Sequence, residues 1–193
     1  MYLDISSYNG DINWRTVADS AEVDGVILRS TTSGGNLDVR AIQNYNGILQ
    51  NLPDVDELSF YKFTYANAYV AARLECRTTL TKLKAAGLHF DYLYLDIEGH
   101  GGKDYTTMQA NEVILGYLDE MKLWNVDNLL RLYFNYNYLK NIIDPVWRSM
   151  PIWLARYNDS MGDIFGANVK LWQYTSNGKI GGITGNVDVS RVV

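Results

Sequence analysis

The sequence has one cysteine, Cys76, three prolines and two histidines in 193 residues. A single cysteine excludes an intrachain disulfide and a zinc site built from several thiolates. Cys76 lies in a stretch whose apolar residues recur at helical spacing, so we expect a half-buried helical thiol without a chemical role.

Long hydrophobic runs and clustered basic residues are also missing. No run of about 18 apolar residues occurs, so we expect no transmembrane helix. The first residues, MYLDISSYNG, place an acid at Asp4 and lack the charged and apolar regions of a signal peptide. The 17 basic residues are outnumbered by 22 acidic ones. Because nucleic acids and anionic membranes are bound through clustered Lys and Arg, we expect neither as a partner.

The length suffices for one compact domain with a full core, so we expect residues 1–193 to form a single domain. Short apolar runs alternate with stretches of helical period, which is typical of α/β proteins. Strands are predicted at 2–6, 25–31, 57–66, 90–99, 129–137, 151–158, 169–175 and 186–193. Helices are predicted at 12–20, 37–52, 69–87, 106–125 and 138–143, with Gly87 ending the third and Thr106 or Thr107 capping the fourth.

No full helix is predicted beyond Pro145. Eight parallel strands with intervening helices favour a closed barrel, and the helix-poor last third departs from the regular alternation of such folds.

The segment YLYLDIEGHGG, residues 92–102, ends an apolar run on two acids. Because side chains alternate along a strand, Tyr94, Asp96 and Glu98 share one face and the apolar residues between them share the other. In a barrel the polar face points inward, with Glu98 nearest the C-terminal mouth, where barrel enzymes carry out their chemistry.

Two further acids lie in the first and last predicted strands, which are neighbours in a closed barrel. Asp4 and Asp188 are therefore expected to converge on Asp96 and Glu98. Like charges so close raise the pKa of at least one member. A protonated carboxyl beside an ionised one is the pair that glycosidic bond cleavage requires.

Aromatic residues are plentiful, with fifteen Tyr and five Trp. Aromatic faces stack on sugar rings, and tyrosine hydroxyls supply polar contacts. Many of these residues fall near predicted strand ends: Tyr61, Tyr133, Tyr136, Trp153, Tyr157, Trp172 and Tyr174.

Three other interpretations remain open. An acid at a strand end is often a helix cap or an ion-pair partner, here of Arg29, Arg131 or Arg156. Asp96, Glu98 and His100 also have the spacing of a divalent-metal site that Asp4 would complete. A non-catalytic sugar-binding module would keep the same groove. No cofactor is implied.

The segments DISSYNGDINW, GVILRST, FYKFTYA, YLDIE, LYFNYNYL, IWLARYN and LWQYTSNGKIGGITGNVDVS occur in the order seen in glycoside hydrolase family 25. The chain resembles these Chalaropsis-type lysozymes, which include many phage endolysins, over about residues 2–190. The family commonly has Tyr-His-Phe where this chain reads Tyr61-Lys62-Phe63, and a Glu-Gly after the second strand where it reads RSTTSGG.

The resemblance implies a TIM-like barrel of eight strands with a reduced helix complement, of (β/α)5(β)3 type. It also implies hydrolysis of the β-1,4 bond between N-acetylmuramic acid and N-acetylglucosamine in bacterial peptidoglycan. Glu98 corresponds to the general acid/base and Asp96 to the residue that orients the substrate acetamido group or stabilises the charged intermediate. The supporting and substrate-binding positions are Asp4, Asp188, Tyr61, Tyr133, Trp153 and Gln173.

Action on the cell wall follows from the same resemblance. We expect either a phage-encoded enzyme released through a holin or an excised module of a longer secreted protein. A separate wall-binding domain would then lie outside this chain.

Overall fold

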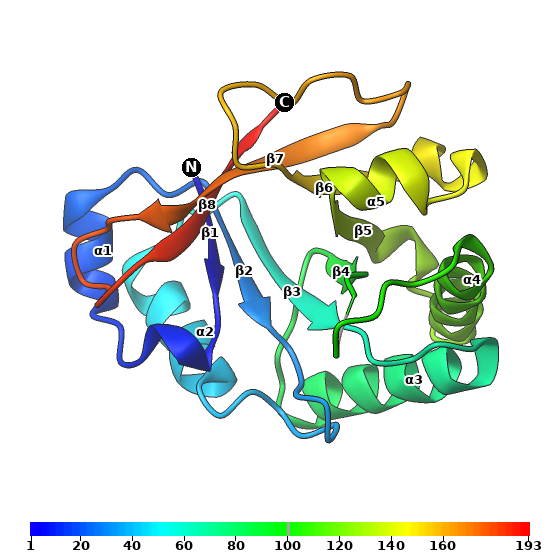
Figure 1. Cartoon of the computed structure of the whole chain (residues 1–193). Coiled ribbons are helices and arrows are strands. Elements are labelled where there is room, and N and C mark those ends of the chain that lie inside the picture. The colour runs from blue at the N-terminus through cyan, green and yellow to red at the C-terminus, as the bar shows by residue number, and fades with distance from the viewer. Residues whose placement is uncertain (100) are drawn as a thin grey trace.

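Eight strands follow one another around a closed barrel in the order in which they occur in the sequence (Figure 1). The computed structural model describes residues 1–99 and 101–193. The strands are β1 (Tyr2–Ile5), β2 (Gly25–Arg29), β3 (Glu57–Phe63), β4 (Leu93–Asp96), β5 (Leu130–Asn135), β6 (Ile152–Ala155), β7 (Val169–Gly178) and β8 (Val187–Val192). The α-helices are α1 (Trp14–Ser20), α2 (Ala41–Asn51), α3 (Tyr69–Ala85), α4 (Thr107–Leu123) and α5 (Tyr136–Asn141). Three short 3-10 helices are η1 (Ser7–Asn9), η2 (Asp127–Leu129) and η3 (Pro145–Ser149).

Local sequence signals fix the ends of the long helices. The Thr106 side chain accepts a hydrogen bond from the backbone of Gln109, whose side chain accepts one from the Thr106 backbone, so the predicted cap of α4 is confirmed. Gly87 follows α3 with φ of 68°, a left-handed conformation that favours glycine, and this stop is confirmed as well.

Strands β1 to β7 are parallel, whereas β8 is antiparallel to both of its neighbours, β7 and β1. The expectation of eight parallel strands is therefore wrong at β8. The reason lies in the length of the connection: only residues 179–186 separate β7 from β8, fewer than the roughly twelve that a parallel crossover needs, so the chain turns back antiparallel to β7. The helix-poor last third is confirmed, and β8 still closes the barrel against β1 (Figure 1).

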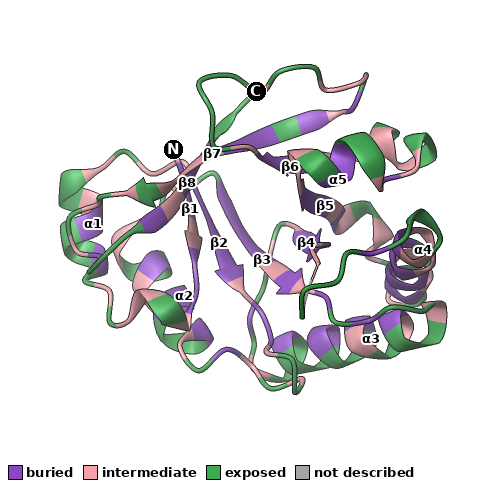
Figure 2. Cartoon of the chain, in the orientation of Figure 1, coloured by how far each residue is buried: buried purple, intermediate pink, exposed green. Residues whose placement is uncertain are grey.

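Two apolar layers occupy opposite faces of the strands. The larger layer packs the outer face against the helices and includes Leu93, Leu95 and Ile97. The smaller layer fills the barrel interior and includes Tyr94, so the predicted alternation along β4 is confirmed. Figure 2 shows buried residues along the strands and on the inner sides of the helices, with exposed residues on their outer sides.

Glycine at the start of β2 is required by the interior packing. A Cβ atom at Gly25 would lie 2.2 Å from the ring of Tyr2, the residue opposite it on β1. The tyrosine ring occupies the space that a side chain at this position would take.

Several predicted details are wrong. Residues 37–40 are not helical, because Thr31 and Leu37 form an antiparallel bridge that delays α2 to Ala41. Strands β3 and β4 end earlier than expected, at Phe63 and Asp96. The Cys76 thiol is fully buried between α3 and α4 rather than half-buried.

Among the described residues, no helix is long and apolar enough to cross a bilayer.

Candidate active site

Four carboxylates meet near the C-terminal end of the parallel strands. Asp4 lies on β1 and Asp188 lies directly opposite it on β8. Asp96 is the last residue of β4, and Glu98 follows two residues later. The negative charge of Glu98 acts on both Asp4 and Asp96, which places all four acids in one electrostatic cluster.

Gln173 on β7 connects the cluster through hydrogen bonds and is completely buried. Its Nε2 donates to Asp4 Oδ2 at 3.3 Å and to Asp188 Oδ2 at 3.5 Å. Its Oε1 accepts from the hydroxyls of Tyr133 at 2.8 Å and Tyr157 at 2.9 Å. Because the two hydroxyls occupy the carbonyl side, the amide is held with its N–H groups toward the acids.

Asp96 is the most deeply buried of the four acids, with 5% of its surface exposed. Its Oδ1 is buried and has no hydrogen-bond partner among the described residues. Burial, followed by the charges of Glu98 and Asp4, raises the pKa of Asp96 well above its usual range. The charges of Lys62 and Arg29 oppose this rise. A buried acceptor without a partner is costly, and such exceptions are concentrated at functional positions.

The pKa values of the other three acids are also raised, in each case mainly by burial. For Asp4, the charges of Asp188 and Glu98 add to this rise, and the Gln173 hydrogen bond opposes it. For Glu98, interaction with the Tyr133 hydroxyl opposes the rise and the charge of Asp188 adds to it. The cluster therefore holds protons at a pH where isolated carboxyls are ionised.

The aromatic candidates lie in the barrel interior, next to the acids. The Tyr133 ring packs against Trp153 at a centroid distance of 4.4 Å with the ring planes tilted by 58°, and Trp153 Nε1 donates to Ser190 Oγ at 2.9 Å. Trp153 is only 1% exposed, so it supports the site from the barrel interior and does not line an open groove. Tyr61 is half-buried, and the charges of Asp4 and Asp96 both act on its hydroxyl.

Three residues of this region were not among the predicted site residues. Arg29, at the end of β2, faces the acids. Its Nε is buried and has no hydrogen-bond partner among the described residues. Its inward position follows from the alternation along β2, which was available in the sequence. Tyr157 was noted only as an aromatic near a strand end. No sequence signal indicated that the charge of Lys62, on the other face of β3, acts on Asp96.

An exposed hollow adjoins the site at Tyr157, whose side chain is 52% exposed while its hydroxyl reaches Gln173. Asn158, Trp172, Tyr174 and Arg191 also line this hollow. The Arg191 guanidinium lies over the Trp172 ring at 4.4 Å from its centroid.

The alternative metal site depended on His100, which lies outside the described residues. Within residues 1–99 and 101–193, no group of three or more His, Cys, Asp or Glu side chains is arranged to hold a metal ion. The arrangement of the four acids supports proton transfer and stabilisation of a developing positive charge.

Comparison with protein families gives one match that spans almost the whole chain. The family model described as "Glycosyl hydrolases family 25" matches residues 3–183. No match was found among the curated proteins.

Solved structures share the fold over the whole barrel. The modular autolysin LytC from Streptococcus pneumoniae, in complex with a synthetic peptidoglycan ligand, has a TM-score of 0.85 and 29% identity, and the match covers 98% of this chain and 45% of that one. The CTP1L endolysin has a TM-score of 0.80 and 22% identity, covering 100% and 66% of the two chains. The catalytic domain of endolysin ply40 from bacteriophage P40 of Listeria monocytogenes has a TM-score of 0.72 and 22% identity, covering 100% and 92%. This chain thus spans less than half of the LytC chain.

Proposed function

This chain belongs to glycosyl hydrolases family 25, and on that premise we propose that it is an N-acetylmuramidase that hydrolyses bacterial peptidoglycan. The bond cleaved is the β-1,4 linkage between N-acetylmuramic acid and N-acetylglucosamine. The observation that carries this proposal is the cluster of four acids, in which Asp96 ends β4 and Glu98 follows two residues later. The peptidoglycan ligand bound by LytC, which matches 98% of this chain, supports the choice of substrate.

We assign Glu98 as the general acid/base. It is less buried than Asp96, and its raised pKa favours a protonated carboxyl that donates to the leaving oxygen. In the second half of the reaction the resulting carboxylate takes a proton from water. Proton transfer of this kind contributes about 10² to 10⁴ in rate.

We assign Asp96 to the charge that develops at the anomeric centre. Its unpartnered Oδ1 is free to accept a hydrogen bond from the substrate acetamido group or to stabilise an oxocarbenium-like state. That role requires the ionised form, and the charges of Lys62 and Arg29 favour it against the surrounding acids.

The other named residues serve binding and support in this proposal. Asp4 and Asp188, fixed through Gln173, hold the sugar and keep a negative field around the site. Tyr133 packs against Trp153 and positions Gln173 through its hydroxyl. Tyr61 extends the polar surface toward β3.

We further propose that residues 1–193 are a single catalytic domain acting on the cell wall. A separate wall-binding domain in the natural protein is consistent with the modular construction of LytC, of which this chain matches less than half. We propose that the enzyme reaches the wall by one of two routes, release during phage lysis or secretion as part of a longer protein.

The decisive experiment is mass spectrometry of peptidoglycan fragments after digestion and borohydride reduction. A muramidase yields reduced muramic acid at the new ends, whereas reduced glucosamine would contradict the proposed bond. Protein that sediments with cell walls but releases no fragments would instead support the sugar-binding module. The Glu98→Gln variant serves as the control without the general acid.

A further inference from the structure

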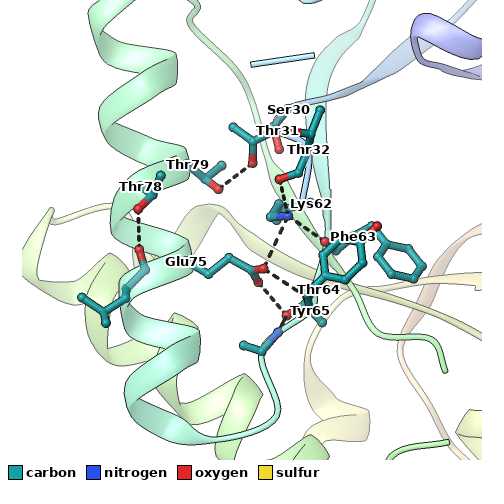
Figure 3. Close-up of polar contacts among 12 residues, drawn as sticks. Ser30, Thr31, Thr32, Lys62, Phe63, Thr64, Tyr65, Glu75, Thr78 and Thr79 are labelled. Carbon is teal, nitrogen blue, oxygen red and sulfur yellow. Dashed lines mark hydrogen bonds and ion pairs between the residues drawn. The ribbon is translucent and has the colours of Figure 1, made fainter. Parts of the chain in front are cut away.

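Lys62 is a buried cation on the outer face of β3, with 1% of its surface exposed. Its Nζ donates to the carbonyl oxygens of Phe63 at 2.8 Å and Thr32 at 3.3 Å. The same nitrogen lies 3.4 Å from Oε2 of Glu75 on α3. Figure 3 shows this ammonium enclosed between the end of β3 and the helix.

Glu75 is held in turn by three groups, two on the segment after β3 and one on α4. Its Oε1 accepts from the Thr64 hydroxyl at 2.6 Å and from the Tyr117 hydroxyl on α4 at 2.8 Å. Its Oε2 accepts from the backbone N–H of Tyr65 at 3.1 Å (Figure 3). The carboxylate therefore fastens the segment that leaves β3 to the two long helices.

The segment that leaves β3 is hydrogen-bonded to the end of β4, which carries Asp96. Phe63, whose carbonyl accepts from Lys62, is the register partner of Asp96 on β4. The next residue, Thr64, donates its backbone N–H to the Asp96 carbonyl at 3.0 Å. The Lys62 ammonium is thus held on the helix side of the strand pair that carries Asp96, and its charge acts on Asp96 from there, while Asp4 acts on it from the barrel interior.

We propose that Lys62 and Glu75 are a positioning pair for Asp96, in which the buried ammonium stabilises the Asp96 carboxylate and Glu75 moderates that effect. The inference deepens the proposed function, because an ionised Asp96 is what the reaction requires. Neither residue touches the reacting atoms in this scheme. Both act through Asp96.

Other charged and titratable groups also face Asp96, and the pair acts against this background. Asp4 comes from β1 and Glu98 from the end of β4, and both disfavour ionisation of Asp96. Arg29 comes from β2 and favours ionisation, as Lys62 does. The hydroxyls of Tyr61 on β3 and Tyr133 on β5 lie within the field of Asp96.

The alternative role for such a pair is purely structural, since a buried lysine must be paired and hydrogen-bonded to be tolerated. The two roles differ in sign. A purely structural pair gives no reason for the titration of Asp96 to move in opposite directions when one partner or the other is replaced. An electrostatic pair shifts the titration of Asp96 upward when the cation is removed and downward when the anion is removed, because the Lys62 ammonium remains protonated at acidic pH.

The experiment is a carbon-13 NMR titration of the aspartate carboxyl groups, with the Asp96 signal identified by its loss in Asp96→Asn. We expect Lys62→Gln to move the Asp96 titration up by about 1 pH unit and Glu75→Gln to move it down by about half a unit. If the two shifts add, the double variant should titrate about half a unit above the parent, between the two single variants. Lys122→Gln, which breaks the exposed pair with Asp119 at 3.2 Å, is the matched control and should leave the titration unchanged.

An unchanged titration in Glu75→Gln, or one that moves upward as in Lys62→Gln, would overturn the proposal. If Lys62→Gln fails to fold, Glu75→Gln still decides the question, because it keeps the cation. The titration needs no catalysis, so an inactive protein with the expected shifts would refute the muramidase function while leaving the pairing intact.

Discussion

Asp4 and Asp188 face each other across the antiparallel pair of β1 and β8, with one amide group between them. Gln173 Nε2 donates to a carboxyl oxygen of each, at 3.3 Å and 3.5 Å. The two acids come from opposite ends of the chain, so this contact forms only when the last strand closes the barrel. Closure of the fold and assembly of the acidic cluster are therefore the same structural event.

Replacing Glu98 by Gln should reduce wall-lytic activity by about 10² to 10⁴, because the amide has a similar shape but cannot donate a proton to the leaving oxygen. Turbidity clearing of cell walls measures the effect, and thermal unfolding shows whether the fold is kept. Exposed Glu22→Gln is the matched control and should retain the parent rate. Clearing at a tenth of the parent rate or faster would remove Glu98 from its assigned role.

Asp96→Asn should lower kcat strongly with little change in KM, since the lost charge acts on the transition state more than on bound substrate. Its residual activity should also show a shifted pH profile. The alkaline limb reports deprotonation of the general acid, and removing a neighbouring negative charge lowers the pKa of Glu98. That limb should move to lower pH. A fixed limb would mean that Asp96 is neutral throughout the active range.

Much of the site was predictable because strand alternation and barrel closure are simple rules. The inward face of β4 followed from the pattern YLYLDIE, and the pairing of first and last strands placed Asp4 near Asp188. The direction of β8 was not predictable from apolar runs, since such runs carry no sign of strand direction. It depended on the short connection after β7, residues 179–186, which became clear only once the ends of both strands were known.

The contact between Lys62 and Glu75 was not predicted for a different reason. Alternation assigns Lys62 to the outer face of β3, which the helices cover, but it does not say which helix residue pairs with the lysine. Only the packed position of α3 brings Glu75 within 3.4 Å of its Nζ. A long-range pair of this kind has no local sequence signature.

Substitutions at Tyr157 distinguish the contribution of its hydroxyl from that of its ring. Tyr157→Phe keeps the exposed ring and loses the hydroxyl that donates to Gln173, so kcat should fall by about fivefold, the value of one hydrogen bond of about 1 kcal/mol. Tyr157→Ala also removes the ring and should raise KM for soluble peptidoglycan fragments. Tyr174→Phe alters another tyrosine of the same hollow and should match the parent. Equal KM values for Phe and Ala would show that the ring does not contact substrate.

Chelation tests the metal interpretation of Asp96, Glu98 and His100. In the carboxylate mechanism the acids themselves supply the proton and the charge, so dialysis against EDTA should leave the rate of wall clearing unchanged. Metal content is then measured on the dialysed protein. A loss of activity that is restored by one divalent cation would favour the metal-dependent hydrolase instead.

The raised pKa of Asp96 has a consequence for stability. Burial and the neighbouring acids raise it in the folded protein, whereas the unfolded chain titrates near the ordinary value of about 3.9. Between these values the folded state binds more protons than the unfolded state, so the contribution of Asp96 favours folding at acidic pH and is lost as the pH rises through the window. Asp96→Asn should therefore raise the Tm at pH 7 by about 2–4 °C, corresponding to about 1 kcal/mol for a chain of this size. The difference from the parent should shrink at pH 4. Exposed Asp54→Asn is the matched control for calorimetry at both pH values. A variant less stable than the parent at pH 7 would show that the Asp96 charge is already compensated in the fold.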